Sequence, residues 1–534
     1  MPSPETRWEE QKQHIGAQIE EQKLALGDLF YSRKILFVLI VLLQVALLLL
    51  CFVFFAAVFR YVYGVMVVLA AVLCIYELNR QNEEAGFKIS WILLVTLLPL
   101  FGWFAYLLMH FDRTNRRIRS NADSIASRVT PLLARDRSVR QALAAQDATA
   151  AAFGVYCEQA GGGGVYDATE TVFYPDGLSF LAALLEALEQ AERFIFLEYF
   201  IINHKDRMWR EILDVLRRKA AAGVEVRVVY DGLGSAMRMP GAYAAQLRRA
   251  GLHVSAFAPV VPLISTHQNN RDHHKIAVID GRVAFNGGIN LADEYINERD
   301  RGVGFWEDTA IRYRGPAVQA FTAMFLEIWH LRTVGNEDYE RYLTRPEPVA
   351  AAPGWTIPFA ASPLSRYKTA ERAYIDLINT ATDHLYLTTP YLCPPYGMLE
   401  ALKYAAQRGV EVDLLLPGRC DKRYSMLLAR SYYPELMKAG IRIFEFQPGF
   451  IHAKGIMADG RKAVAGTINL DYRSLYLHYE CGVYQVGTAA VAAMEQDFQR
   501  LLAQSRRVDL EQYFAYPKLA RALGQTLRLV APLL

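Results

Sequence analysis

The stretch His273-His274-Lys275-Ile276-Ala277-Val278-Ile279-Asp280 is matched later in the chain by His452-Ala453-Lys454-Gly455-Ile456-Met457-Ala458-Asp459. Both follow the pattern His-x-Lys-x-x-x-x-Asp. A second cluster follows each octet at the same spacing, Gly287-Gly288-Ile289-Asn290 in one half and Gly466-Thr467-Ile468-Asn469 in the other. One octet could arise by chance, but two octets with trailing clusters in register indicate a duplicated domain that carries its chemistry in both halves.

The similarity between the halves extends well beyond the octets. In each half, strand-like apolar runs alternate with helical stretches that end at a glycine, which is typical of βα units in a largely parallel sheet. The matching segments are 194–201 with 385–391, 224–230 with 410–416, and 250–254 with 439–443. We therefore predict the α/β class, with two homologous lobes related by a pseudo-twofold axis over residues 166–345 and 346–534.

The composition excludes several simpler readings of the chain. At 534 residues it is too long for one hydrophobic core, and its formal charge of +3 is too small to indicate a nucleic-acid-binding protein. The six cysteines show no metal-binding or disulfide spacing. The hydrophobic fraction of 53% is high, and the excess is concentrated before residue 112.

That excess lies in apolar runs at 35–59, 62–78 and 89–111. At 1.5 Å per residue, runs of this length can cross a bilayer, and their near-absence of charge disfavours buried helices of a soluble domain. We therefore predict N-terminal transmembrane helices over 35–111, after a polar helix within 1–34 and before a helical connector over 112–165. Basic residues flank both ends of this region, so the membrane side of the lobes stays open.

The octets predict which side chains act together. Side chains two apart on a strand share a face, so His273 projects with Lys275, and His452 with Lys454. Asp280 and Asp459 have the opposite parity and precede Gly-Arg, which is typical of a turn. We therefore expect the two aspartates to stabilise the turn after each strand rather than to touch the substrate, although they belong to the motif.

If the lobes meet face to face, the two sets converge in one site with two imidazoles, two ammonium groups and the amides of Asn290 and Asn469. Such a site suits a phosphodiester. One imidazole can attack phosphorus while the other transfers protons, and the ammonium and amide groups can stabilise the developing charge. No metal or other cofactor is required, because the lysines supply the positive charge.

A nucleophilic histidine needs a partner that fixes its tautomer. Asp308 and Glu480 lie at comparable distances after their octets, and we predict that they are the orienting acids. The alternative is that they are ordinary surface carboxylates. Glu198, in an apolar strand, and Tyr391 are predicted to line the substrate cleft, with burial against a structural partner as the alternative.

Asp272, His273 and His274 with nearby His267 could also be read as metal ligands. The second half has only His452 at this place, so a duplicated metal site fails. We therefore treat His274 and His267 as non-catalytic.

These residues resemble the phospholipase D superfamily, and more closely the bacterial cardiolipin synthases. The segments that carry the resemblance are 89–108, 197–199, 271–276, 287–291, 449–454, 469–474 and 531–534. The resemblance implies two phospholipase D-like lobes that transfer a phosphatidyl group from one phosphatidylglycerol to the hydroxyl of another, giving cardiolipin and glycerol through a phosphohistidine. It implies His273 as nucleophile and His452 as acid/base, with the lysines and aspartates of both octets counted as catalytic.

The resemblance also implies a multi-pass protein of the bacterial inner membrane whose partners are phospholipids and not nucleic acid. The basic, amphipathic tail after Lys518 could lie on anionic lipid, or could pack as an ordinary C-terminal helix. Thr467 and His478 depart from the family, which usually has serine and asparagine there. His478 therefore leaves the acceptor preference open.

Other functions stay open at this point. A membrane-bound phospholipase D that hydrolyses lipids, or a synthase that uses phosphatidylethanolamine or another alcohol, would share the same octets. A non-enzymatic scaffold predicts at least one damaged octet, and a nuclease is disfavoured by the weak charge and the apolar segments.

Overall fold

The computed structural model describes residues 33–54, 56–79, 84–110, 113–258, 270–331 and 337–533. The chain forms two compact units, one before residue 112 and one that carries both predicted lobes. The polar helix predicted within 1–34 lies outside the described residues except for its last two positions, and His267 also lies outside them.

The first unit consists of helices α2 (Arg33–Phe54), α3 (Ala56–Asn79), α4 (Ala85–Leu97) and α5 (Pro99–His110). The predicted third apolar run is not one continuous helix, because it breaks at Leu98 before Pro99. Gly102 allows α5 to pack closely on α4, since a Cβ there would lie 2.6 Å from the Cα of Val95.

Among the described residues, one helical segment, Tyr61–Asn79, is long and apolar enough to cross a membrane. The apolar segments Val38–Leu50 and Ala85–Leu97 are shorter. The multi-pass arrangement predicted for 35–111 therefore stays a prediction.

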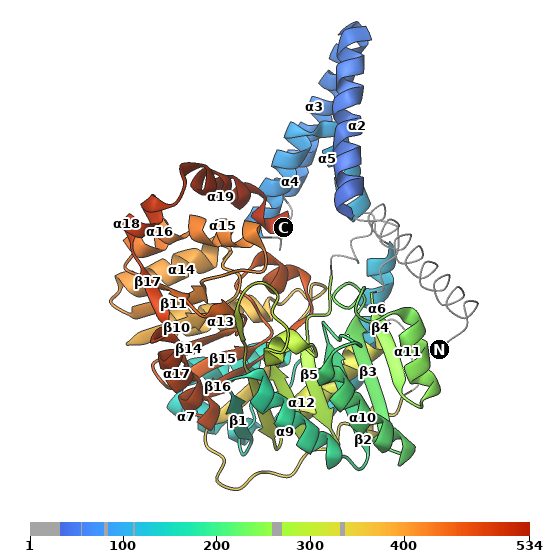
Figure 1. Cartoon of the computed structure of the whole chain (residues 1–534), viewed down its shortest axis with the longest axis vertical. Coiled ribbons are helices and arrows are strands. Elements are labelled where there is room, and N and C mark those ends of the chain that lie inside the picture. The colour runs from blue at the N-terminus through green and yellow to red at the C-terminus, as the bar shows by residue number, and fades with distance from the viewer. Residues whose placement is uncertain are drawn as a thin grey trace, which may run out of the picture. The chain divides into compact units, whose positions relative to one another are not determined.

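The first lobe of the second unit is built on a seven-stranded sheet, drawn in green to yellow in Figure 1, with strand order β1-β8-β6-β5-β2-β3-β4. Its strands are β1 (Glu170–Tyr174), β2 (Phe194–Tyr199), β3 (Glu225–Asp231), β4 (His253–Phe257), β5 (Lys275–Ile279), β6 (Val283–Gly287) and β8 (Ala310–Arg314). The first octet begins just before β5 and fills it, and β5 lies next to β2 in the middle of the sheet.

The second lobe, orange to red in Figure 1, has an eight-stranded sheet in the order β17-β12-β11-β10-β14-β15-β16-β9. Its strands are β9 (Trp355–Ala361), β10 (His384–Thr388), β11 (Glu411–Pro417), β12 (Arg442–Phe446), β14 (Gly455–Ala458), β15 (Lys462–Gly466), β16 (Glu480–Val486) and β17 (Ser505–Val508). Residues Gly455–Ala458 of the second octet form β14, which corresponds to β5, and His452 and Lys454 lie just before this strand.

The two sheets have the same strand order apart from the added edge strand β17, in agreement with the predicted duplication. The expectation of a largely parallel sheet is wrong in detail. In the first lobe β2, β3 and β4 are parallel, whereas β5, β6, β8 and β1 pair antiparallel. The reason is that each octet strand turns directly into the next strand through Asp-Gly, and a tight turn of this kind joins only antiparallel strands.

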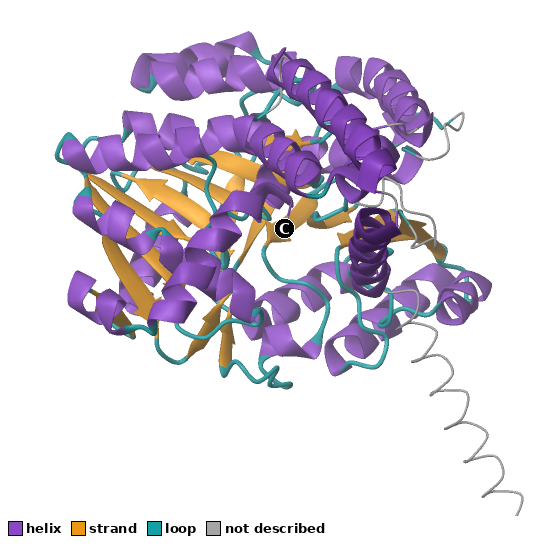
Figure 2. Cartoon of the chain, turned by 90° about the horizontal axis from the view of Figure 1, so that it is seen from above, coloured by secondary structure: helices purple, strands orange, loops and turns teal. Residues whose placement is uncertain are grey.

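Helices cover the strands of the second unit on both sides (Figure 2). They are α6 (Arg113–Val129), α7 (Arg137–Gln146), α8 (Ala148–Gln159), α9 (Gly177–Glu189), α10 (Arg207–Ala221), α11 (Gly241–Arg249), α12 (Val318–His330), α13 (Thr369–Thr380), α14 (Tyr396–Gln407), α15 (Arg423–Ser431), α16 (Tyr433–Lys438), α17 (Ala489–Leu502), α18 (Leu510–Ala515) and α19 (Lys518–Val530). One hydrophobic core contains buried residues of both sheets, for example Ile276 and Met457, so the two lobes are fixed against each other.

The C-terminal helix α19 packs on α15, where Gly524 permits close approach: a Cβ at this position would lie 2.5 Å from the carbonyl oxygen of Leu427. Arg528 is ion-paired with Glu435 of α16 at 3.0 Å. Leu519 and Leu523 remain exposed on this helix. The tail is therefore a packed helix with an exposed apolar edge.

Candidate active site

Two short backbone pairings join the lobes at the start of the two octets. Strand β7 (Phe305–Glu307) of the first lobe pairs in parallel with β13 (Gly449–Ile451) of the second. In the reciprocal position, Asp272 forms a parallel bridge with Tyr479. Each catalytic segment is thus held beside a segment of the opposite lobe.

These pairings anchor the two octet histidines through their backbone. The His273 N–H donates to the carbonyl oxygen of Tyr479 at 2.9 Å, and the His452 N–H donates to the carbonyl oxygen of Glu307 at 2.7 Å. The residue after each acceptor is an acid that was predicted to orient a histidine. The acid therefore reaches the histidine of the other lobe.

The side-chain contacts show that each acid reaches the histidine of the opposite lobe. His273 Nδ1 lies 2.9 and 3.0 Å from the two carboxylate oxygens of Glu480, and His452 Nδ1 lies 2.6 Å from Asp308 Oδ2. Glu480 is fully buried and Asp308 is 1% exposed, so the reading of these acids as ordinary surface carboxylates is wrong. Because a carboxylate only accepts hydrogen bonds, it holds the proton on Nδ1 and leaves Nε2 to react.

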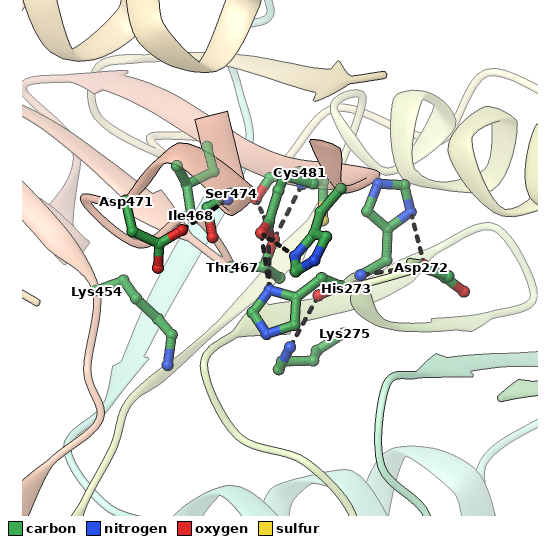
Figure 3. A network of polar contacts seen from close by, with 12 residues as sticks. Asp272, His273, Lys275, Lys454, Thr467, Ile468, Asp471, Ser474 and Cys481 are labelled. Carbon is green, nitrogen blue, oxygen red and sulfur yellow. Dashed lines mark hydrogen bonds and ion pairs between the residues drawn. The ribbon is translucent and has the colours of Figure 1, made fainter. Parts of the chain in front are cut away.

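Both octet lysines lie in this site and are almost completely buried. Lys275 Nζ donates to the carbonyl oxygen of His273 at 2.8 Å. Lys454 Nζ lies 2.7 Å from His452 Nδ1 and 4.0 Å from Asp308 Oδ2. The close-up in Figure 3 contains His273 and Lys275 of the first lobe together with Lys454 of the second.

The charged groups of the two half-sites act on one another. Burial lowers the pKa of the His273 ring well below its usual range, and the charges of Lys275 and Lys454 lower it further. Burial followed by the same two lysines also lowers the pKa of His452. Each histidine therefore feels the lysine of the opposite lobe, and both rings are neutral at neutral pH.

Burial likewise perturbs the charged partners. It lowers the pKa of Lys275 to about 8 and the pKa of Lys454 to about 7, and it raises the pKa of Asp308 to about 7. Because these pKa values lie near neutral pH, the groups can exchange protons and can change their protonation when an anionic ligand binds.

The two acids are accommodated differently by the clusters that follow the octets. A Cβ at Gly288 would lie 2.0 Å from Asp308 Oδ1, so only glycine leaves room for this acid. The corresponding residue of the second lobe is Thr467, whose hydroxyl donates to Glu480 and accepts the Cys481 N–H at 3.0 Å (Figure 3). The threonine therefore keeps the hydroxyl function expected of the family's serine.

Aromatic rings form the walls around the histidines. The Phe200 ring centroid lies 5.0 Å from that of His273, and Trp306 and Phe450 lie 5.2 and 5.7 Å from that of His452. These rings could not be predicted from the sequence, because no local pattern distinguishes an aromatic residue of the core from one beside a catalytic group.

The octet aspartates do not reach the reacting groups. Asp280 accepts the backbone N–H groups of Glu192, Arg193 and Phe194 at 2.7–2.8 Å, and Asp459 accepts those of 382–384. Both have left-handed backbone, with φ of 55° and 56°. Counting them among the catalytic residues is therefore wrong, because they hold the turn after each octet strand, as their parity predicted.

The two predicted asparagines differ in their surroundings. The Asn290 side chain is hydrogen-bonded within its own lobe. Its Oδ1 accepts the Ile201 N–H at 2.9 Å, and its Nδ2 donates to the Tyr295 hydroxyl at 2.6 Å. Asn469 is 5% exposed, and its Oδ1 has no hydrogen-bond partner among the described residues. The amide of Asn469 is therefore the better placed of the two to meet a ligand.

The expectation that Glu198 lines the cleft is wrong. Its carboxyl is fully buried and lies 2.7 Å from His274 Nδ1, on the face of the sheet opposite to that of His273 and Lys275. Tyr391 is partly exposed, and its hydroxyl donates to the Asp421 carboxylate at 3.0 Å. A substrate-binding role for Tyr391 stays a prediction.

His478, the departure noted in the sequence, does lie in the site. Its ring centroid is 5.6 Å from that of His273, and its Nδ1 is 3.7 Å from Glu480 Oε1. Burial lowers its pKa to about 4, so a third neutral imidazole stands beside the octet pair.

Comparison with known proteins gives a consistent picture. The family model "Cardiolipin synthase, PLD-like domain" matches residues 184–329 and 374–502, and the model "Phospholipase_D-nuclease N-terminal" matches residues 65–109. A cardiolipin synthase of Alkalihalophilus pseudofirmus is 32% identical over 85% of this chain and 90% of its own length, and one of Geobacillus thermodenitrificans is 32% identical over 89% and 94%.

An uncharacterised protein of Streptococcus mutans is 41% identical over 86% of this chain and 99% of its own length. Among solved structures, a phosphatidylserine synthase from Haemophilus influenzae aligns with 68% of this chain and 95% of its own, at a TM-score of 0.54 and 14% identity. This structural match shows that the fold is shared.

Proposed function

The chain belongs to the bacterial cardiolipin synthases of the phospholipase D superfamily, and from this premise we propose that it transfers a phosphatidyl group between two phosphatidylglycerol molecules, giving cardiolipin and glycerol. The observation that carries this proposal is the reciprocal pairing of His273 with Glu480 and of His452 with Asp308. It gives the unbound site two imidazoles, each with its proton held on Nδ1 and with Nε2 free.

In the first step, Nε2 of His273 attacks the phosphorus of the donor lipid. His452 enters this step with a proton on each ring nitrogen, the second taken up together with the anionic lipid. The bond from phosphorus to the glycerol oxygen breaks, and the Nε2 proton of His452 passes to the leaving glycerol. Lys275 and Lys454 balance the charge on the non-bridging oxygens, and the Asn469 amide adds a hydrogen bond. The step produces a phosphatidyl group bound to His273 and a neutral His452 whose Nε2 is free to accept a proton.

In the second step, His452 removes a proton from a hydroxyl of the acceptor phosphatidylglycerol. The hydroxyl oxygen attacks phosphorus, the bond from phosphorus to His273 breaks, and cardiolipin is released with both imidazoles restored. His273 and His452 are only 7% and 6% exposed, which disfavours water as the acceptor. No step uses a metal ion.

We also propose that residues 35–111 anchor the enzyme in the bacterial inner membrane through more than one crossing. The support is the apolar segment Tyr61–Asn79, the neighbouring apolar helices, and lipid substrates that reside in the bilayer. The phospholipids of this membrane would then serve as substrates and would also surround the anchoring segment.

The test is to incubate the purified full chain with phosphatidylglycerol and to measure cardiolipin, phosphatidic acid and free glycerol. We expect cardiolipin and glycerol in equal amounts, with no effect of a chelator on the rate. Phosphatidic acid as the main product would instead identify a hydrolase, and a product formed only with phosphatidylethanolamine or another alcohol would identify a different acceptor.

Two variants test the roles of the histidines, His273→Ala and His452→Ala, and both should lose turnover. His253→Ala is the matched control, because His253 is an exposed histidine at the start of β4, remote from the octets in sequence. Full activity in either octet variant would refute the proposed roles.

A further inference from the structure

The C-terminal helix α19 directs its leucines away from the protein. Leu519, Leu523 and Leu529 are 72%, 47% and 55% exposed, and Ala522 is exposed among them. At 3.6 residues per turn these four positions fall within about 120° of the helix circumference, so they form one outward apolar face. An ordinary surface helix places its apolar stripe against the core. In α19 this arrangement is reversed.

The contacts that hold α19 on the lobe come mainly from small and polar residues. Beside the close approach of its glycine to α15, Gln525 donates to the Ser431 carbonyl oxygen at 3.1 Å. Arg528 is ion-paired with Glu435 at 3.0 Å, and its guanidinium lies 4.1 Å from the centroid of the Tyr432 ring. The exposed leucines therefore contribute little to the attachment of this helix to the protein.

The apolar face continues onto the preceding helix α18. Phe514 of this helix is 54% exposed, and the guanidinium of Arg521 lies 5.2 Å from the centroid of its ring. A single exposed apolar side chain is ordinary, whereas several large ones on two consecutive helices form a patch. A patch of this kind marks a contact with another protein or with a membrane.

The charges beside the patch favour a membrane with anionic lipids. Helix α19 contains Lys518, Arg521 and Arg528 and no acidic residue. Arg423 is exposed at the start of α15, the helix on which α19 packs. Exposed leucines next to basic residues are typical of helices that lie in the interface of an anionic bilayer. A second copy of the chain fits less well, because a twofold contact would bring the same positive charges together.

The patch lies near the candidate active site. Helix α15 begins immediately after Lys422, whose charge acts on His452 and whose Nζ lies 4.7 Å from the centroid of the Tyr391 ring. The nine residues of α15 extend over about 14 Å, and α19 lies beside them in Figure 1. A bilayer on this patch would therefore be close to the site.

We propose that the outward face of α18 and α19 lies on an anionic bilayer, with Phe514, Leu519, Leu523 and Leu529 inserted among the acyl chains. This contact is additional to the apolar segments before residue 112. Its consequence is that a phospholipid reaches the octet histidines from the bilayer beside α15. The consequence rests on the proposed function, whereas the contact itself does not.

The test uses the full chain in vesicles of phosphatidylcholine and phosphatidylglycerol in equal amounts. Leu523 is replaced by the photoreactive residue p-benzoylphenylalanine, and adducts formed on irradiation are identified by mass spectrometry. We expect phospholipid adducts on the peptide that contains α19. Leu178 is the matched control position, because it is an equally apolar side chain, 54% exposed on α9, at the other end of the same unit (Figure 1). The same replacement at Leu178 should give no lipid adducts.

The composition of the adducts tests the role of charge. Phosphatidylglycerol and any cardiolipin formed from it, counted together, should exceed their share of the vesicle lipid. Lys518→Glu should lower this excess, because it replaces a positive charge beside the leucines with a negative one. An excess that is absent in the wild type, or that is unchanged in Lys518→Glu, would overturn the preference for anionic lipid.

The adducts also distinguish the possible occupants of the patch. Absence of lipid adducts at Leu523, or equal amounts at Leu523 and Leu178, would overturn the proposal. Adducts mainly between two chains would identify a second copy as the occupant and would overturn it as well. Both leucines are exposed, so their replacement leaves the fold intact. The readout needs no turnover, so failure of the proposed reaction and failure of this contact are distinguishable.

Discussion

Asp308 of the first lobe is hydrogen-bonded to His452 of the second, at 2.6 Å between Oδ2 and Nδ1. The reciprocal contact joins Glu480 to His273 at 2.9 Å. Each half-site is therefore incomplete without the other lobe, which explains why the duplicated domain works as one enzyme and not as two independent ones.

The first prediction concerns these acids. Asp308→Asn and Glu480→Gln remove the carboxylate that holds the histidine proton on Nδ1. The proton can then move to Nε2, the nitrogen that must react. We expect each to lower kcat by roughly 10² to 10⁴, measured as cardiolipin formation at saturating phosphatidylglycerol.

The neighbouring Glu307 provides a matched control for Asp308. Its carboxylate accepts from Arg500 at 2.6 Å and does not contact His452, which meets only its backbone carbonyl. Glu307→Gln should therefore retain most of the activity. A loss as large as that of Asp308→Asn would indicate a general effect of neutralising buried acids.

A second prediction separates the nucleophile from the acid. A phosphatidyl ester of p-nitrophenol needs no protonation of its leaving group, so His452→Ala should still release a burst of nitrophenol and retain the phosphatidyl group on His273. His273→Ala should give no burst. A burst in His273→Ala and none in His452→Ala would reverse the two roles.

A third prediction tests the space at Gly288. Ala at this position would place a Cβ 2.0 Å from Asp308 Oδ1, so the acid must move away from His452. We expect Gly288→Ala to reduce kcat by about 10- to 100-fold, measured in the same assay. Gly397→Ala, where a Cβ meets nothing within 4 Å, should leave the rate unchanged.

A fourth prediction concerns pH. Burial lowers the pKa of Lys454 to about 7, so the free enzyme loses this positive charge as pH rises through that value. The protonated form of Lys454 binds the anionic phosphodiester, so kcat/KM should fall above pH 7. The change in kcat should be smaller, because bound substrate favours the protonated lysine.

Lys454→Arg tests this assignment, because a guanidinium stays protonated over the whole range. Its kcat/KM is expected to be lower at pH 6.5 owing to altered geometry, yet flatter between about pH 7 and 9. If the wild type and this variant decline in parallel, the titrating group lies elsewhere.

The sequence by itself determined the duplication, the strand that carries each octet, and the turn-holding role of Asp280 and Asp459, because each follows from local periodicity and spacing. The strand parity of His273 with Lys275 needs only the two-residue repeat of a strand. The tertiary structure alone decided that each acid contacts the histidine of the opposite lobe and that Glu198 faces His274. These contacts depend on which surfaces of the sheets meet, and contacts between residues 76 to 207 positions apart leave no trace in local pattern.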